Sequence, residues 1–290
     1  LIVDINRDGL PDIIEAADNG GSGVVRLWQN PGDPFSAAWT VNTLGTFTTT
    51  AAQSLGVGDL DNNGTPDVVV GLSNGKVVAW SNPIAGNWGP SSPVGNLSLP
   101  IVGLAVTNAD HDGQLDVVAT GSGTPSVVTA WHNTGQPFNG GWSQMTIGNT
   151  TDATLALTAA DFNRDGDDDF VTATGDMGTT GGLQFWTNAL IRSSVRFRTP
   201  DIPPPNDHHT AIALSGFDSH AMDIHDMNRD GRPDIVVATM DGSLIIAQNN
   251  GSPFVNFVSD WPTTTVGTAF GFFAVAVGDL DGDGWPDIAT

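Results

Sequence analysis

The sequence predicts an all-β fold, a β-propeller of four-stranded blades with calcium loops. Three observations predict it: an acidic nine-residue pattern recurs six times, a Trp-x-Asn block follows about 25 residues after most copies, and the apolar runs in between are short. No stretch shows a sustained helical period. Four short strands in a repeat of about 50 residues are typical of a propeller blade.

The acidic pattern, here called the acidic loop, has oxygen donors at positions 1, 3, 5 and 9 and glycine at position 6. The residue after position 9 is always Ile, Val or Phe, and β-branched runs such as Val68–Val70 and Ile235–Val237 follow. Each loop is therefore predicted to lead into a strand. The six copies, loops 1 to 6, begin at Asp4, Asp59, Asn108, Asp161, Asp226 and Asp279.

This spacing suits calcium, a hard cation that takes about 6–8 oxygen ligands. Alternate positions of a tight loop point inward, and glycine at position 6 permits the sharp turn. The backbone carbonyl of position 7 can then face the ion. Every residue type has this carbonyl, which explains why the residue at position 7 varies. An EF-hand would instead close with Glu at position 12 between helices. We expect about six Ca²⁺ sites, with positions 1, 3, 5, 7 and 9 occupied by Asp4, Asn6, Asp8, Leu10, Asp12; Asp59, Asp61, Asn63, Thr65, Asp67; Asn108, Asp110, Asp112, Gln114, Asp116; Asp161, Asn163, Asp165, Asp167, Asp169; Asp226, Asn228, Asp230, Arg232, Asp234; and Asp279, Asp281, Asp283, Trp285, Asp287.

The alternative is a turn rich in Asp and Asn that only links two strands. Such a turn needs one or two of these residues, whereas each loop gathers three or four carboxylates. Two unit charges 4 Å apart repel by about 1 kcal/mol in water and by about 4 kcal/mol at an effective dielectric constant of 20. Without a cation each loop would disfavour its own folded geometry, so the pattern favours calcium binding.

The acidity of the chain follows from these loops. The formal charge is −23, and 19 of the 32 acidic residues are aspartates at loop positions 1, 3, 5 and 9. Lys76 is the only lysine and there is no basic stripe, which argues against nucleic acid or an anionic membrane as partner. There is no cysteine and no apolar run long enough for a transmembrane helix, so we expect neither disulfides nor membrane insertion.

The calcium loops also indicate a compartment. Extracellular calcium modules have Kd values on the order of 10⁻⁴–10⁻³ M, so we expect a secreted protein in the extracellular space or at the cell surface. No signal peptide is visible, and the chain begins at Leu1 rather than Met. We therefore expect a fragment or processed product whose residues 1–290 form a single β-propeller domain.

Repeat spacing predicts the order of elements in a blade. The loops start 55, 49, 53, 65 and 53 residues apart. Each repeat is predicted as a strand, the loop, a strand, a tight turn, a strand ending in Trp-x-Asn, and a fourth strand. Because a sixth loop would need a sixth blade, the pattern excludes five blades and favours an incomplete seven-bladed ring, with six as the alternative. The blocks are Trp28–Asn30, Trp80–Asn82, Trp131–Asn133, Trp186–Asn188 and, without Trp, Ala247–Asn249.

The loops resemble those of the FG-GAP/VCBS repeat family, related to the N-terminal β-propeller of the integrin α-subunit, and the resemblance covers essentially the whole chain. The Phe-Gly and Gly-Ala-Pro dipeptides of the integrin version are missing, with Leu55–Gly58 and Val70–Leu72 in comparable places. The chain is thus more similar to the broad microbial repeat type. Nothing resembles the integrin partner domain, so integrin ligand binding is not implied.

Every interpretable motif serves the scaffold, so we expect a non-enzymatic recognition, adhesion or assembly module with a protein or glycan partner at the cell surface, or a place in a larger assembly. One alternative is a carbohydrate-binding propeller that uses its tryptophans, although their fixed place favours packing between blades. The asparagines of the blocks are expected to close Asx-turns.

A second alternative is an enzyme or a subunit of an enzyme complex that acts through a His-rich segment, residues 207–225. It follows a Pro-rich insertion, Pro200–Pro205, and could build a transition-metal or catalytic site. A polar surface loop is the simpler interpretation, because no HExxH or comparable ligand spacing is present. The residues concerned are Asp207, His208, His209, Asp218, His220, Asp223 and His225.

Overall fold

The computed structural model of the chain is built from β-strands. It describes residues 1–290 except 19, 34–36, 84–86, 151, 176–180, 189–196, 199–211, 215–218, 240, 252–260, 269–273 and 280–282. Two compact units make up the chain: unit 1 is Leu1–Ser122 with Val127–Gly148, and unit 2 is Gly123–Ser126 with Asn149–Thr290. No helix within the described residues is long and apolar enough to cross a membrane.

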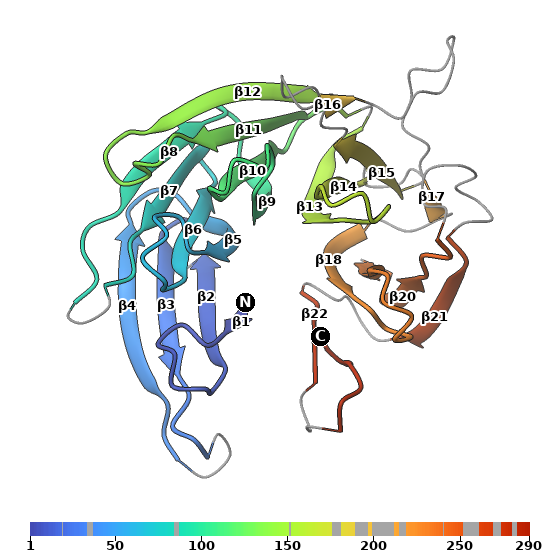
Figure 1. Ribbon diagram of the computed structural model, residues 1–290, viewed down its shortest axis with the longest axis horizontal. Coiled ribbons are helices and arrows are strands. Elements are labelled where there is room, and N and C mark those ends of the chain that lie inside the picture. Colours follow the sequence, from blue (N-terminus) through green and yellow to red (C-terminus); the bar gives the residue numbers. More distant parts are fainter. Residues whose placement is uncertain are drawn as a thin grey trace. The chain divides into compact units, whose positions relative to one another are not determined.

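Unit 1 contains three four-stranded antiparallel sheets, blades 1 to 3, and in each the strands pair in sequence order (Figure 1). Blade 1 consists of β1 (Ile2–Val3), β2 (Asp12–Asp18), β3 (Gly23–Gln29) and β4 (Thr40–Phe47). Blade 2 consists of β5 (Ala52–Gly58), β6 (Asp67–Leu72), β7 (Lys76–Trp80) and β8 (Ser92–Asn96). Blade 3 consists of β9 (Ile101–Thr107), β10 (Asp116–Gly121), β11 (Val127–Asn133) and β12 (Trp142–Asn149).

Unit 2 contains blades 4 and 5 and a two-stranded sheet. Blade 4 consists of β13 (Thr154–Ala160), β14 (Asp169–Thr174) and β15 (Gly181–Asn188), with the short β16 (Phe197–Arg198) and β17 (Ile212–Leu214) both paired to β15. Blade 5 consists of β18 (Ser219–His225), β19 (Asp234–Thr239), β20 (Ser243–Ala247) and β21 (Thr263–Thr268). The last sheet pairs β22 (Ala276–Gly278) with β23 (Asp287–Ala289).

The second strand of each of blades 2 to 5 is buried along its whole length. In β6, Val69 belongs to the apolar core shared with blade 3, whereas Val68 and Val70 belong to the core shared with blade 1. Successive side chains of a strand point to opposite faces, so a blade between two neighbours needs apolar residues at every position. This requirement explains why Val68–Val70 are all apolar.

Blades within each unit stack through their inner strands. In unit 1, β5 packs against β2 and β9, and in unit 2, β18 packs against β13 and β22. Blades 4 and 5 share a core in which the rings of Phe162, Phe185 and Trp261 meet at centroid distances of 5.0 to 5.9 Å. The sheets confirm the predicted order of elements within a repeat, in which the acidic loop lies between the first and second strands.

Two tryptophans of the Trp-x-Asn blocks lie between blades, as predicted. Trp80 is 2% exposed, belongs to the core shared by blades 1 and 2, and meets Phe47 edge-on at 6.0 Å between ring centroids. A Cβ atom added at Gly45 of β4 would lie 2.6 Å from the Trp80 ring, so only glycine leaves room for it. Trp131 in turn packs over Gly95 of β8.

The predicted number of blades is wrong. Neither seven nor six blades are present: the described residues form five blades and the two-stranded β22–β23 sheet. That prediction assumed that each acidic loop requires a complete blade. Loop 6 instead joins two strands whose Val277 and Ile288 pack against Val236 and Ala238 of blade 5.

Candidate metal sites

The acidic loops share one backbone conformation. Glycine at position 6 has a positive φ in all six, from 79° in Gly231 to 95° in Gly166. Position 4 is also left-handed, with φ between 55° and 62°, in Arg7, Asn62, His111, Arg164 and Arg229. Two left-handed residues close together reverse the chain tightly. Position 4 was not predicted, although its lack of β-branched residues is a signal that could have indicated it.

Side chains at positions 1, 3 and 5 fold inward over the loop and accept its own N–H groups. In loop 1, Asp4 accepts hydrogen bonds from the N–H of Asp8 (3.1 Å) and Gly9 (2.8 Å). Asn6 accepts from Asp8 N–H at 3.0 Å, and Asp8 accepts from Leu10 N–H at 2.9 Å. Loops 4 and 5 repeat all four bonds. The side chains at positions 1, 3 and 5 therefore turn toward the backbone of their own loop. Among the described Asp, Glu and His residues, three ligand groups lie within 4.8 Å of one another only in loops 2 and 3.

In loops 1 to 5 the aspartate at position 9 is buried, and in four of them it ties two segments together. Asp67 is fully buried, and its carboxylate accepts hydrogen bonds from Leu60 N–H at position 2 (2.8 Å) and from Asn82 N–H, two residues after β7 (2.7 Å). The same pair of bonds holds the start of the loop against the Trp-x-Asn strand in three other repeats, at Asp12, Asp116 and Asp234.

Loop 2 brings three carboxylates together. Oxygens of Asp59, Asp61 and Asp67 all lie within 4.8 Å of one another. Burial raises the pKa of Asp67 to about 7, and the charges of Asp61 and Asp59 add to the rise, while hydrogen bonds from Asn82 and Leu60 oppose it. A bound cation would stabilise the ionised carboxylates. Because the donors are all oxygens, the set fits Ca²⁺, which positions 1, 3, 5 and 9 would hold.

Loop 3 brings together a different set. Here Asp110 and Asp116 meet His132, with one ligand atom from each within 4.8 Å of the others. His132 is the middle residue of a Trp-x-Asn block, and the sequence prediction missed it. The signal was present, because the corresponding places in the other repeats hold Gln29, Ser81, Thr187 and Gln248, none of which has an imidazole.

The asparagine of the Trp-x-Asn block links neighbouring blades. Its Nδ2 donates to the carbonyl of position 2 in the preceding acidic loop: Asn82 to Ile5 at 2.8 Å, Asn133 to Leu60 at 2.8 Å and Asn249 to Phe162 at 2.9 Å. The predicted Asx-turn is confirmed at Asn30, Asn133 and Asn249, whose Oδ1 accepts the N–H two residues on. The bridge between blades was not predicted.

Side chains at position 4 reach the next acidic loop in the same unit. Asn62 donates to Gln114 at 2.9 Å, Arg164 donates to the carbonyl of Asp230 at 3.1 Å, and the guanidinium of Arg229 lies 3.9 Å from the Trp285 ring centroid. Loops of adjacent blades are therefore in contact.

The proposed role of the position 7 carbonyl as a ligand stays a prediction.

Several predicted residues lie outside the described part of the chain. They include Asp281 of loop 6 and, in the His-rich segment, Asp207, His208, His209 and Asp218, together with the insertion 200–205. The side chain of His220 is likewise not described. Asp223 accepts hydrogen bonds from the N–H of Val277 (2.7 Å) and Ile224 (2.8 Å), so it serves the contact between β18 and β22.

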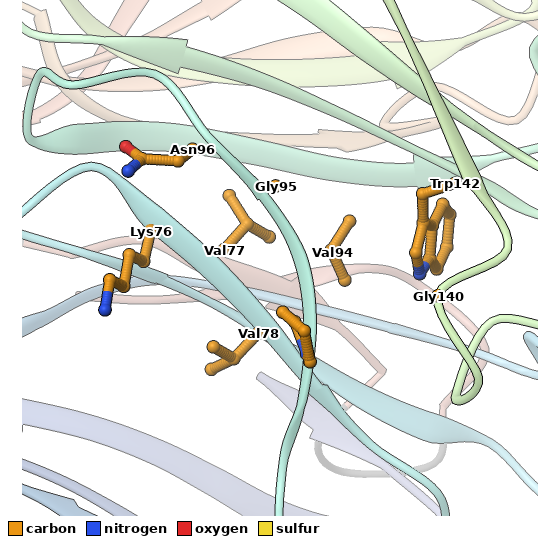
Figure 2. Close-up of a pocket in the computed structure, with 9 residues that line it drawn as sticks. Lys76, Val77, Val78, Val94, Gly95, Asn96, Gly140 and Trp142 are labelled. Carbon is orange, nitrogen blue, oxygen red and sulfur yellow. The ribbon is translucent and has the colours of Figure 1, made fainter.

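Unit 1 also contains a groove of about 430 Å³ between β7 and β8 of blade 2 and the start of β12 in blade 3 (Figure 2). Trp142 forms one wall, and the backbone turn at Gly140 lies beside it. Lys76 and Asn96 supply polar groups, and the rest of the lining is mainly apolar: Val77, Val78, Pro93, Val94 and Gly95.

Comparison with known families agrees with the repeat structure. The model of the FG-GAP-like repeat matches residues 4–70, 59–119, 108–172 and 226–290, each stretch starting at an acidic loop. No curated protein matches the sequence. Since the matched stretches cover more than half of the chain, this β-propeller chain belongs to the FG-GAP-like repeat family.

Proposed function

We propose that the chain is a calcium-stabilised, non-enzymatic recognition module that acts outside the cell on a protein or glycan partner. The observation that carries calcium binding is the convergence of Asp59, Asp61 and Asp67 in loop 2. Three carboxylates this close repel one another, and one of them is fully buried. A divalent cation held by oxygen donors relieves both costs.

The distribution of perturbed carboxyl groups supports a structural role. Strongly shifted pKa values in a cleft often mark catalytic groups. Within the described residues, every carboxyl group with a raised pKa is the position 9 aspartate of an acidic loop: Asp12, Asp67, Asp116, Asp169 and Asp234. Burial is the largest cause in each case. These shifts are accounted for by the loops, so they support a binding module rather than an enzyme.

Calcium use supports the proposed extracellular location. Extracellular calcium modules bind calcium with Kd values on the order of 10⁻⁴–10⁻³ M, which suits the calcium concentration outside cells. The contacts between adjacent loops then give the proposed ions a second role, because each filled loop would hold the side chain that reaches it from the neighbouring blade.

Equilibrium dialysis against millimolar Ca²⁺, followed by elemental analysis of the protein, tests the proposal. We expect about six ions per chain, and an Asp59→Ala variant should lose one of them. Binding of no calcium, or of calcium that is indifferent to Asp59, would contradict it. Magnesium at the same concentration is the control, since Mg²⁺ demands a more regular octahedral site and sheds its water reluctantly.

The groove beside Trp142 favours a second candidate function, carbohydrate binding. An indole wall suits the apolar face of a sugar ring, and Lys76 and Asn96 offer hydrogen bonds at its rim (Figure 2). A glycan array should then give a signal that Trp142→Ala and Lys76→Ala both remove. Trp285→Ala is the matched control, because that indole is half exposed and belongs to loop 6. An array without signal would eliminate this candidate.

A further inference from the structure

We propose that loop 3 is a site for a divalent transition metal of the zinc class, with Asp110, Asp116 and His132 as ligands. This inference goes beyond calcium binding, since it gives one loop of the set a different preferred metal, which calcium replaces only when zinc is absent. Calcium prefers oxygen donors, whereas imidazole nitrogen suits zinc, copper, nickel and iron. A histidine among loop ligands therefore changes the class of ion that the site selects.

The geometry of the three side chains fits such an ion. Nδ1 of His132 lies 2.9 Å from Oδ2 of Asp110 and 3.3 Å from Oδ1 of Asp116. Ligands about 2.0–2.1 Å from a tetrahedral Zn²⁺ are about 3.3 Å apart, so little movement would be needed. Although Nδ1 is buried and faces two carboxylates, it makes no hydrogen bond. A metal ion between the three groups would satisfy it.

A second observation concerns Asn108 at position 1. In loops 1, 4 and 5 the position 1 carboxylate accepts the N–H groups of positions 5 and 6. In loop 3 the Oδ1 atom of Asn108 is buried and has no hydrogen-bond partner among the described residues. Loop 3 has therefore lost one carboxylate that calcium would use, and it holds an uncommitted amide oxygen in its place.

His132 is held over the loop by its neighbours in the chain. Trp131 is 1% exposed in the core between blades 2 and 3, and Asn133 donates its N–H to Oδ1 of Asp116 at 2.8 Å. The intervening side chain must then lie beside positions 3 and 9. The equivalent Ser81 of blade 2 also lies there, with its hydroxyl 3.5 Å from Oδ2 of Asp61. Blade 3 thus places a nitrogen where blade 2 places a short hydroxyl.

The competing interpretation is a plain ion pair, in which a protonated His132 neutralises Asp110 and no metal binds. The two interpretations differ in one measurable respect. A metal site takes up one ion of Zn²⁺ and loses it when the imidazole is removed, whereas an ion pair leaves zinc binding unaffected by His132.

Isothermal titration with Zn²⁺ in millimolar Ca²⁺ tests the proposal on the whole chain. We expect one zinc site that weakens at least 10-fold in His132→Gln, a residue that repeats 1 and 5 carry at this place. His111→Gln is the matched control, because His111 is an exposed residue of the same loop, and it should leave zinc affinity unchanged. His132→Ser, as in blade 2, serves if the glutamine variant does not fold.

Equal zinc affinity in the wild type and in both His132 variants would overturn the proposal, as would complete displacement of zinc by millimolar calcium. Anomalous diffraction at the zinc edge gives an independent readout, and a peak away from His132 would also overturn it. Failure of the calcium proposal can be distinguished from failure of the zinc proposal. A chain that binds no calcium but binds one zinc ion at His132 would contradict the calcium proposal and leave the zinc proposal standing.

Discussion

Positions 5 and 9 of the acidic loops differ in burial: in loops 1 to 5, position 5 is exposed and position 9 is buried. In loop 4, Asp169 at position 9 is fully buried, and it accepts a hydrogen bond from the N–H of Asn188 at 2.9 Å. Asp165 at position 5 is exposed, and within the described residues its carboxylate accepts hydrogen bonds from Asn163 Nδ2 and Asp167 N–H, both in the same loop. The buried aspartate therefore supports the fold with or without an ion, whereas the exposed one matters only when an ion is bound.

The electrostatics sharpen this difference. Burial raises the pKa of Asp169 to about 8, and the charges of Asp165 and Asp161 raise it further, against the hydrogen bond from Asn188. A buried carboxylate next to two others is costly without a counterion. The buried Asp169 thus has a role both in the fold and as a proposed ligand. The exposed Asp165, at the rim of the loop, has a role only as a proposed ligand.

The largest expected effect is that of Asp169→Ala. It removes the acceptor of a buried N–H as well as a proposed ligand, so it should lower the free energy of unfolding by about 2–5 kcal/mol in calcium and by about 1–3 kcal/mol in EDTA. Urea unfolding in both buffers measures this. A loss confined to the calcium buffer would show that position 9 has no role in the fold of its own.

Next is the effect of Asn133→Ala, the largest after Asp169→Ala among those expected both with and without calcium, which extends the comparison to the bridge between loops. The side chain is fully buried and donates to the carbonyls of Leu60 and Leu115. Its loss leaves buried carbonyls unpaired and should cost about 1–3 kcal/mol, equally with and without calcium. Asn30→Ala is the matched control, because within the described residues Asn30 bonds only inside blade 1. Equal losses of unfolding free energy in both variants would show that the hydrogen bond between blades does not contribute to stability.

A conditional effect is expected for Asp165→Ala. In EDTA the change should stay within about 0.5 kcal/mol, as for other surface substitutions. In calcium the variant should bind one ion fewer and lose the stabilisation that this ion provides, about 2.7 kcal/mol when calcium is at 100 times the Kd. Thermal unfolding and ion counting together check it, and an equal loss in both buffers would contradict the division between rim and interior.

The smallest effect is expected for Asp168→Ala. Position 8 lies outside the ligand positions, so the ion count should stay the same and unfolding in calcium should change by no more than about 0.5 kcal/mol. This variant tests the register of loop 4, which has three aspartates in a row, Asp167–Asp169. If it proved as damaging as Asp165→Ala, positions 5 and 9 would be assigned to the wrong residues.

The local features of this chain could be predicted from the sequence. Alternating oxygens and a glycine predicted the loop and its turn at Gly64, and β-branched residues after position 9 predicted the strand that begins at Asp67. The buried tryptophans followed from their fixed place at a strand end. All of these depend on residues within a few positions of one another, which is the range that a repeat pattern encodes.

Features that depend on blade stacking could not be predicted. Asn133 bonds to Leu60, 73 residues away, and His132 joins Asp110 only because a strand from the same blade returns beside the loop. The predicted number of blades was wrong for the same reason: repeat spacing gives the number of loops, whereas loop 6 lies between the paired strands β22 and β23 and not in a four-stranded blade. Sequence spacing does not say how much neighbouring sheet a repeat requires.

The most direct test of the account is thermal unfolding of the chain in millimolar Ca²⁺ and in EDTA, at the same ionic strength. An ion that binds only the folded state stabilises it by RT ln(1 + [L]/Kd), about 2.7 kcal/mol per site at 100 times the Kd. With several loops filled, we predict a rise in Tm in calcium that grows with its concentration and is reversed by the chelator. Two superimposable unfolding curves would contradict the claim that these acidic loops are calcium sites.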